Sequence, residues 1–232
     1  MAASEPVEGL PHDFSGTVRL FPLPNLVMFP HVVQSLHVFE PRYRELLEDA
    51  LAQDQLITMA LLQPGWEADY DKRPPVFPVT CVGRVLTHSR LEDGCYNILL
   101  LGLRRASVIR ELPAERSYRR AEVRLLEDRY PSSSASRRLN LRRELLDCFK
   151  QFLPKSVLGQ QSIQHLFGDQ LSLGVLTDIM SFTVQFDLPA KQQLLSEWNV
   201  ALRAEKLLKL LRDKAGEQPR PTVQFPPDFS QN

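Results

Sequence analysis

The residues with the clearest potential for chemistry are two cysteines and a histidine at even spacing. Cys81, His88 and Cys95 follow one another along the chain, and thiolates and imidazoles are the ligands that zinc prefers. Structural zinc sites usually contain close pairs such as CxxC, which this chain lacks. The turn signal Asp93-Gly94 also separates Cys95 from the other two residues. We therefore predict ordinary buried thiols and no metal ligand set.

The remaining nucleophiles and histidines form no recognisable catalytic set. A cysteine nucleophile needs a histidine held close by a third group, and a cryptic enzyme using Cys81 or Cys95 is kept as an alternative. His31 and His37 share one face of an extended segment, and we interpret them as structural. No glycine precedes a lysine and no GxSxG occurs, which excludes the usual P-loop and the nucleophile elbow. The sequence predicts a non-enzymatic protein without a cofactor.

A basic stretch between residues 104 and 124 could contact phosphate groups. Tyr118 lies inside it and could stack on a base, as in RNA-binding surfaces. Glutamates are interleaved, however, and strand alternation would direct the arginines to both faces of a sheet. We favour a solvated strand face and keep RNA binding as the alternative function. The arginines are Arg104, Arg105, Arg110, Arg116, Arg119, Arg120 and Arg124.

Apolar residues near prolines and aromatic residues in a loop are the candidates for binding polypeptide. From Leu20 to Val33 the chain is apolar but interrupted by prolines, which keep the backbone irregular and can leave apolar groups at a rim. The stretch QPGWEADYDKRPP is a long polar loop, and aromatic residues in loops often serve binding. The predicted contacts are Leu26, Met28 and Phe29 in the first segment and Trp66 and Tyr70 in the loop.

The composition is that of an ordinary globular protein. The 232 residues are 43% hydrophobic and 24% charged, with a formal net charge of zero. A neutral balance gives no electrostatic footprint for nucleic acid or for an anionic membrane. No stretch approaches the roughly 18 to 20 apolar residues that span a bilayer. An odd, sparse set of three cysteines and a start without an apolar run predict a cytoplasmic location.

Strand signals dominate residues 17–130, after an N-terminus over 1–16 that we expect to be disordered. Prolines break TVRLFPL and LVMFP, which predicts edge strands or strand ends, and one helix opens at Pro41. VTCVGRVLTHS and CYNILLLG flank Asp93-Gly94 and predict a hairpin with a two-residue turn. RRASVIREL and YRRAEVRLLE alternate as separate half-buried strands. These strands predict a small closed or nearly closed barrel.

Helical periodicity follows a linker at 131–138 and covers residues 139–215. A first helix begins at Leu139 and ends at Pro154, and two short helices are expected over 156–167 and 171–183. A single long helix is predicted from Asp187 to Gly216. The remaining residues, 216–232, form a proline-rich tail that we expect to be extended or disordered. The chain is thus predicted to be α+β, with a barrel followed by a helical bundle.

The N-terminal pattern resembles the substrate-binding domain of Lon proteases. LFPLPNLVMFPHVVQSLHVFEPRYRELLEDAL is similar to that family's PLxxxVLFPxxxxPLxVFExRY, with Phe39–Tyr43 as its most specific part. Gly83, Gly94, Gly102 and Arg105 follow in the family's order. AKQQLLSEWNVALRAEKLLKLL resembles its closing helices. The resemblance covers about residues 17–213.

The resemblance implies a PUA-like β-barrel with one inserted helix, joined to a helical bundle. It also implies binding of unfolded or client polypeptides, by a stand-alone domain or an adaptor related to proteolysis. A separate protease or chaperone is a candidate partner, and no membrane partner is expected. The ATPase and Ser-Lys peptidase parts of full Lon have no counterpart in these 232 residues.

Overall fold

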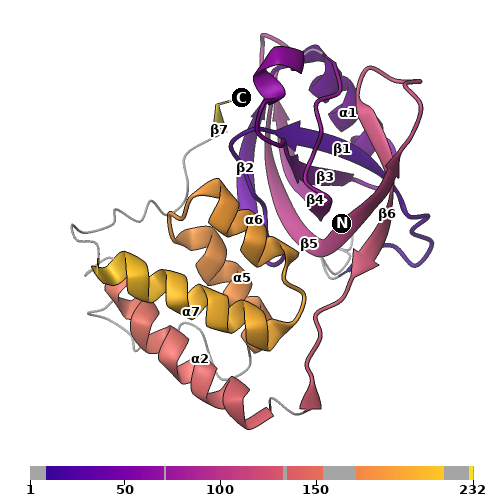
Figure 1. Cartoon of the computed structure of the whole chain (residues 1–232). Coiled ribbons are helices and arrows are strands. Elements are labelled where there is room, and N and C mark those ends of the chain that lie inside the picture. The colour runs from indigo at the N-terminus through magenta and orange to yellow at the C-terminus, as the bar shows by residue number, and fades with distance from the viewer. Residues whose placement is uncertain (1–8, 71, 133–134, 154–170, 217–229, 232) are drawn as a thin grey trace, which may run out of the picture.

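The computed structural model describes residues 9–70, 72–132, 135–153, 171–216 and 230–231, which form a β-rich half and a helical half (Figure 1). The strands are β1 Thr17–Leu23, β2 Val33–Val38, β3 Leu56–Leu61, β4 Val79–Arg90, β5 Tyr96–Glu111, β6 Arg119–Leu126 and β7 Ser230–Gln231. The helices are α1 Pro41–Leu51, α2 Ala135–Phe149, α5 Leu173–Thr183, α6 Leu188–Ser196 and α7 Val200–Gly216, with short 3-10 helices η1 Trp66–Asp69 and η3 Lys150–Phe152. The α+β class predicted from the sequence is confirmed.

Five strands close into a ring. The sheet order is β4-β3-β1-β6-β5, and a further pairing between β4 and β5 joins its ends. Closure removes the free edges that open sheets expose. Strand β2 lies outside this ring and pairs antiparallel with the first part of β5, from Val33↔Leu101 to Val38↔Tyr96. Among the described strands, β2 and its short partner β7 are therefore the additions to a closed barrel.

The strand predictions are confirmed in outline and wrong in detail. CYNILLLG and RRASVIREL form one continuous strand, β5. Where the two segments join, the ladder with β4 shifts register between the pairs Gly83↔Gly102 and Val82↔Arg104, and such a bulge bends a strand without ending it. The hairpin between β4 and β5 is present, but Arg90 pairs with Tyr96, so five residues connect the strands. In that connection Gly94 has a positive φ of 80°.

The segment LVMFP is not a strand. It crosses the start of the β2–β5 pair as irregular backbone, and the amide of His31 donates to the carbonyl of Gly102 at 2.8 Å. A Cβ atom on Gly102 would lie 2.0 Å from the carbonyl oxygen of Phe29. This position accepts only glycine without displacement of the backbone, which accounts for Gly102 in the sequence pattern.

The helical half differs from the prediction at its last element. In place of one helix from Asp187 to Gly216, α6 and α7 are separated at residues 197–199. The amide of Arg129 donates to the carbonyl of Trp198 at 2.8 Å, and the amide of Val200 donates to the carbonyl of Arg129 at 3.1 Å. Arg129, which follows β6, thus pairs by backbone hydrogen bonds with the residues between α6 and α7. The side chain of Asn199 accepts the amide of Ala201 and caps α7.

Two further helix predictions have different outcomes. Helix α5 confirms the helix expected over 171–183, whereas the helix expected over 156–167 lies outside the described residues. The same holds for residues 1–8 of the predicted disordered N-terminus and for residues 217–229 of the predicted tail. None of the described helices is long and apolar enough to cross a membrane.

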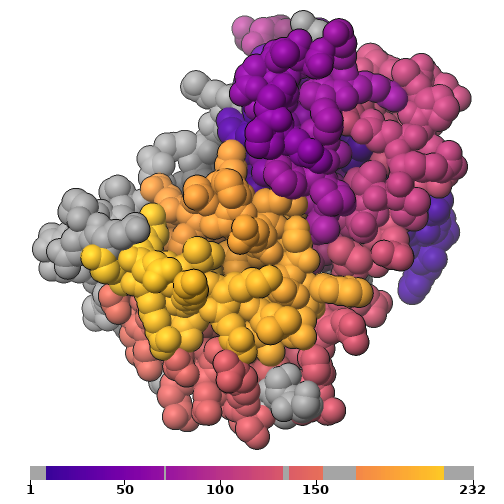
Figure 2. All heavy atoms as spheres, viewed as in Figure 1, coloured from indigo at the N-terminus to yellow at the C-terminus, as the bar shows by residue number. Residues whose placement is uncertain are grey.

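The two halves share one hydrophobic core. The largest buried cluster runs from barrel residues such as Phe21 and Leu100 to helical residues such as Phe149, Leu176 and Leu207. Figure 2 shows α5, α6 and α7, in orange and yellow, lying directly against the barrel. A second, smaller cluster fills the other side of the sheet, around Val18, Leu20, Val82, Ala106 and Val123. Burial on both sides fixes the barrel strands and holds the bundle in place.

Candidate functional site

The segment Phe39–Tyr43, the most specific part of the sequence pattern, fastens α1 to the barrel. Pro41 occupies the first turn of α1, where its missing amide hydrogen costs nothing. The Tyr43 ring is 3% exposed and lies 4.2 Å from the ring of Phe21. Its hydroxyl donates to the carbonyl of Pro22 at 2.9 Å, and burial raises its pKa. Tyr43 therefore has a structural role.

The aromatic loop residues are joined to the same segment. Trp66 and Tyr70 meet edge to face with ring centroids 5.3 Å apart. The guanidinium of Arg42 lies 4.6 Å from the Tyr70 ring centroid, and the Tyr70 hydroxyl donates to Glu40 at 2.6 Å. Burial and this bond to Glu40 raise the pKa of Tyr70. Both rings remain partly exposed, so they stay predicted contacts for polypeptide.

The prediction that Met28 and Phe29 lie at an exposed rim is wrong. Their side chains are 1% and 0% exposed, respectively, and belong to the main core. The irregular backbone that the prolines impose turns these side chains inward beneath the crossing over Gly102. Leu26 is only partly buried and packs against the same core. Of the three residues, Leu26 alone can offer surface to a partner.

The exposed apolar surface lies instead on strand β2 and its neighbours. We call it the outer β2 face and define it by Val33 (41% exposed), Phe39 (43%), Leu86 (37%) and Leu99 (37%). Val33 pairs with Leu101 and Ser35 with Leu99, so Val33 and Leu99 are diagonal neighbours on one side of the sheet. Leu86 is the extra residue of a bulge in β4, next to Thr87, which pairs with Leu99. The sheet thus presents several apolar side chains to solvent at one place.

This face adjoins the edge of β2 that β5 does not use. Residues 33, 35 and 37 point outward, whereas Leu36 and Val38 are each 1% exposed and point into the core. The outward ring of His37 is held by a contact of 2.8 Å between its Nδ1 atom and Oδ1 of Asn97. It stacks on Phe39 with centroids 6.0 Å apart. Among the described residues, only β7 pairs with the other edge of β2.

A buried ion cluster joins the barrel to the helices. We call it the junction clamp; its members are Arg105 from β5, Asp128 after β6, Asp178 in α5 and Arg203 in α7. Arg105 and Asp178 form a bidentate pair, one bond of which measures 2.9 Å. Arg203 forms a second bidentate pair with Asp128 at 2.6 and 2.9 Å. Arg105, Asp178 and Arg203 are 3%, 0% and 0% exposed, and the two positive and two negative charges match.

Backbone groups complete the junction clamp. The Nε atom of Arg105 donates to the carbonyl of Leu195 at 2.8 Å, and Nη1 of Arg203 donates to the carbonyl of Glu197 at 2.8 Å. Burial opposes ionisation of Asp128, but hydrogen bonds and the charge of Arg203 outweigh it and lower its pKa. The clamp thus has the partners that buried charges require. Its role is structural.

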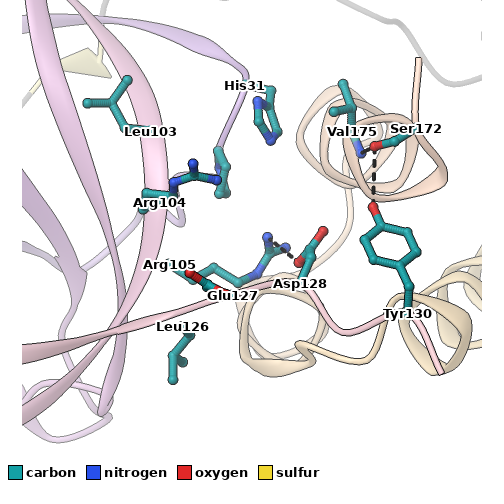
Figure 3. Close-up of a pocket in the computed structure, with 11 residues that line it drawn as sticks. His31, Leu103, Arg104, Arg105, Leu126, Glu127, Asp128, Tyr130, Ser172 and Val175 are labelled. Atoms are coloured by element: carbon teal, nitrogen blue, oxygen red, sulfur yellow. Dashed lines mark hydrogen bonds and ion pairs between the residues drawn. The ribbon is translucent and has the colours of Figure 1, made fainter. Parts of the chain in front are cut away.

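A cleft of about 370 Å³ opens above the clamp, between the barrel and α5. Figure 3 shows His31 and Arg104 on the barrel side, and Tyr130 bonded to Ser172 on the helical side, with a hydroxyl distance of 3.3 Å. His31 has a positive φ of 65°. Burial outweighs nearby Asp178 and Asp128 and lowers its pKa. The lining of the cleft mixes charged and polar side chains from the barrel with Ser172 and Val175 from the helical side.

The basic stretch is largely neutralised. Arg105 belongs to the junction clamp, and four other arginines of the stretch pair with carboxylates. These pairs are Arg110–Glu122, Arg116–Glu45, Arg119–Glu111 and Arg120–Glu115. Tyr118 is 4% exposed and donates to Asp49 at 2.6 Å, so it cannot stack on a base. The pairing favours the interpretation of a solvated strand face over an RNA surface.

Cys81 is a buried thiol, as predicted, whereas Cys95 is only partly buried, so the prediction of a buried thiol is wrong there. Burial raises the pKa of the Cys81 thiol, and desolvation and Asp93 raise that of Cys95. A nucleophilic cysteine needs a lowered pKa, so neither residue supports the alternative of a cryptic enzyme. In the part of the chain that the structure describes, no three His, Cys, Asp or Glu side chains come together as a metal site.

Together these features define an α+β domain, a closed barrel clamped to a helical bundle with an exposed apolar face beside an added strand. Residues 17–213 match the model of the ATP-dependent protease La (LON) substrate-binding domain. The chain belongs to this family, which confirms the resemblance seen in the sequence.

Individual relatives agree. The Lon protease of Aquifex aeolicus (strain VF5) is 28% identical over 202 residues, which cover 85% of this chain and 25% of the relative. That of Heliobacterium modesticaldum is 26% identical over 195 residues, covering 83% of this chain and 23% of the relative. The chain therefore spans about a quarter of the length of these relatives.

Solved structures share the fold. The N-terminal domain of Mycobacterium avium complex Lon protease superposes with a TM-score of 0.66 at 16% identity, covering 85% of this chain and 98% of that one. A Lon N-terminal domain protein from Xanthomonas campestris gives a TM-score of 0.57 at 20% identity, covering 83% of this chain and 97% of that one.

Sequence reasoning missed the outer β2 face and the junction clamp. A signal for the first was present, because VQSLHVF places Val33, Ser35, His37 and Phe39 on one side of an extended segment. A weaker signal for the second was Asp178, a lone carboxylate inside the apolar helix LGVLTDIMSFT. A charge in such a position needs a buried partner.

Proposed function

We propose that this chain is a non-catalytic module that captures unfolded or apolar polypeptide segments on its outer β2 face. The observation that carries the proposal is the exposure of Val33, Phe39, Leu86 and Leu99 beside β2, which among the described strands is the long one outside the closed ring. Apolar side chains provide affinity by leaving water, and a sheet edge provides backbone hydrogen bonds that do not depend on sequence. This combination suits clients that share only exposed apolar character.

The loop aromatics extend the proposed surface. Phe39 directly precedes Glu40, whose carboxylate accepts the hydroxyl of Tyr70. Trp66 packs against Tyr70, so an extended client lying along β2 would meet these rings beyond Phe39. Leu26 is a further proposed contact at the margin of the core. This arrangement supports an apolar path of several side chains with a polar rim, as in other binding surfaces.

The family adds support from its name, a substrate-binding domain. The proposed chemistry is binding alone, with the described residues providing neither a nucleophile–base pair nor a metal cluster. We propose that captured segments pass to a separate protease or chaperone, for which the chain acts as an adaptor in the cytoplasm. The helical half, held by the junction clamp, keeps the barrel rigid during capture.

The test is binding of the purified chain to a labelled, permanently unfolded polypeptide at low and high salt. The double variant Val33→Ser/Leu99→Ser should weaken binding about tenfold, because two exposed apolar contacts are worth roughly 1.4 kcal/mol. Binding by the wild type should tolerate salt, since apolar burial is not screened.

Leu139→Ser provides the matched control. Leu139 is 70% exposed on α2, so this change removes an equally large apolar group away from the outer β2 face and should leave binding unchanged. An equal loss of polypeptide affinity in both variants would show nonspecific hydrophobic binding and contradict a binding site on the outer β2 face. Tight, salt-sensitive binding to a labelled single-stranded RNA, without a polypeptide signal, would replace the proposal with RNA binding.

A further inference from the structure

Strand β7 brings the end of this sequence back to the barrel. Ser230 and Gln231 pair in parallel with β2, in the register Leu36↔Ser230 and His37↔Gln231. In Figure 1 this short strand lies beside β2, far along the chain from its neighbour in space. The contact is made by backbone pairing, which any extended peptide can provide.

The edge that β7 occupies is unusual within this fold. Strands β1, β3, β4, β5 and β6 satisfy each other around the ring, so β2 is the long strand with an edge outside that ring. Natural sheets cover such edges because unpaired amides and carbonyls recruit other strands. Here the described cover consists of two residues against a strand of six.

The side chains around this edge favour an apolar strand. Val33 and Phe39 lie at either end of β2, 41% and 43% exposed, on the outward side. Successive residues of an added strand alternate between the two faces, so every second side chain of an added peptide would lie next to this outward row. The row is continuous with Leu99 on β5 through the pair Ser35↔Leu99.

We propose that the β2 edge is a docking site for an extended polypeptide strand in parallel orientation, and that Ser230 and Gln231 occupy it in cis. The chain then restrains its own capture of clients, and a client binds by displacing β7. This inference rests on the proposed function, and it adds the mode of docking and a built-in competitor.

The expected strength follows from competition. A client can bind only those molecules in which the β2 edge is open. Its apparent dissociation constant therefore equals the intrinsic dissociation constant divided by the open fraction. The proposal requires β7 to occupy the edge in most molecules, and an occupancy of about four molecules in five corresponds to a fivefold loss of apparent affinity. Removing the competitor should therefore tighten client binding several-fold.

The first experiment uses the full chain with Ser230→Pro/Gln231→Pro. Proline has no amide hydrogen and cannot complete a strand ladder, so β7 should leave the edge. We expect about fivefold tighter binding of the unfolded polypeptide. Successive amides of a strand point to opposite edges, so hydrogen exchange should become faster only at those amides of Leu36–Val38 that face β7 and not β5. Adding the polypeptide to this variant should slow that exchange again. The control Ser230→Thr/Gln231→Thr keeps strand propensity and should match the wild type.

A second variant tests the opposite state. His37→Cys/Gln231→Cys, with Cys95 and Cys148 changed to serine, places two thiols on paired residues. Neighbouring strands are about 4.8 Å apart, within the range that a disulfide spans. Oxidation should lock β7 on the edge and abolish client binding, and reduction should restore it. His37→Cys alone, in the same background, controls for the loss of the imidazole.

The outcomes separate this inference from the proposed function. Equal client affinity in the wild type and the proline variant, with unchanged exchange at Leu36–Val38, would overturn occupation of the edge in cis and leave polypeptide binding standing. Client binding that leaves these amides unprotected in the proline variant would overturn docking on the edge. Absence of client binding in every variant would overturn the proposed function together with the inference.

Discussion

The junction clamp and the outer β2 face differ in the burial and polarity of their side chains. In the clamp, Arg105, Asp178 and Arg203 are almost completely buried, and with Asp128 the two positive charges are matched by two negative ones. On the outer β2 face, Val33 and Phe39 remain about two-fifths exposed. The junction clamp buries charged groups away from solvent, whereas the outer β2 face exposes apolar groups to solvent. The comparison indicates that this chain separates the residues that hold it together from those available to a partner.

Removing a carboxylate from the clamp should have the largest effect on stability. Asp178→Ala leaves Arg105 and Arg203 short of a buried counter-charge, and breaking a buried pair in this way costs about 3 to 5 kcal/mol. The free energy of unfolding from urea titrations measures the loss. Glu122→Ala is the control, because its pair with Arg110 is exposed and worth about 0 to 1 kcal/mol. Equal losses in both variants would contradict a special role for the clamp.

Gly102→Ala should come next. The new methyl group would collide with the Phe29 carbonyl oxygen, and such overpacking costs about 1 to 3 kcal/mol. The change lies in β5 between the clamp residue Arg105 and the outer-face residue Leu99, so it couples the two regions. We expect a lower unfolding free energy in urea, together with altered amide chemical shifts at the start of β2. A stability equal to that of the wild type would show that the crossing segment is free to move.

Lys191 is a partly buried cation for which the described residues include no ion-pair partner, in contrast to the arginines of the junction clamp. The ammonium of Lys191 donates to the carbonyl of Phe182 at 3.0 Å, and burial lowers its pKa from 10.5 to about 8. Between these values the unfolded chain holds a proton that the folded chain has released. The free energy of unfolding should therefore rise with pH from about 8 to about 10.5.

Lys191→Met should abolish that rise. It should also stabilise the chain at neutral pH by roughly 1 kcal/mol, because the charged form no longer has to be buried. Urea titrations between pH 7 and about 10.5 compare the two chains. A parallel rise in both would assign the pH dependence to other groups.

The smallest change in stability is expected on the outer β2 face. Val33→Ser/Leu99→Ser alters half-exposed groups and should change the free energy of unfolding by less than about 0.5 kcal/mol per site. The same variant should lose most of its affinity for unfolded polypeptide. A large loss of stability would mean that these residues belong to the core, and the distinction between the two regions would fail.

Local patterns in the sequence account for much of the fold. Alternation along the strands, Asp93-Gly94 between two apolar runs and the helical stripes predicted the barrel, the β4–β5 hairpin and the helical half. These features depend on contacts near in sequence, so the residues that decide them lie side by side. The exact hairpin connection and the division between α6 and α7 were not predicted. The second depends on the bridge from Arg129 to residues 198–200.

The residues of the candidate site were harder to predict from the sequence than the fold. Met28 and Phe29 were assigned to the surface because prolines interrupt their segment, but irregular backbone can lie in a core when its polar groups find partners. Here His31 and Gly102 provide such pairing. The clamp joins residues from 105 to 203, and no periodicity links charges so far apart. The role of β2 as the strand outside the ring follows from pairing partners, which composition does not specify.

Closure of the barrel delays folding during synthesis, because strands far apart in the sequence must pair. Strand β1 completes the ring by pairing with β6, Thr17 with Glu122, about 100 residues later. At a synthesis rate of about 5 to 20 residues per second, β1 waits roughly 5 to 20 seconds for this partner. The junction clamp can form only later, after Arg203 has been synthesised. A nascent chain of this protein therefore exposes an unfinished apolar sheet on the ribosome for longer than a sheet built only from hairpins would.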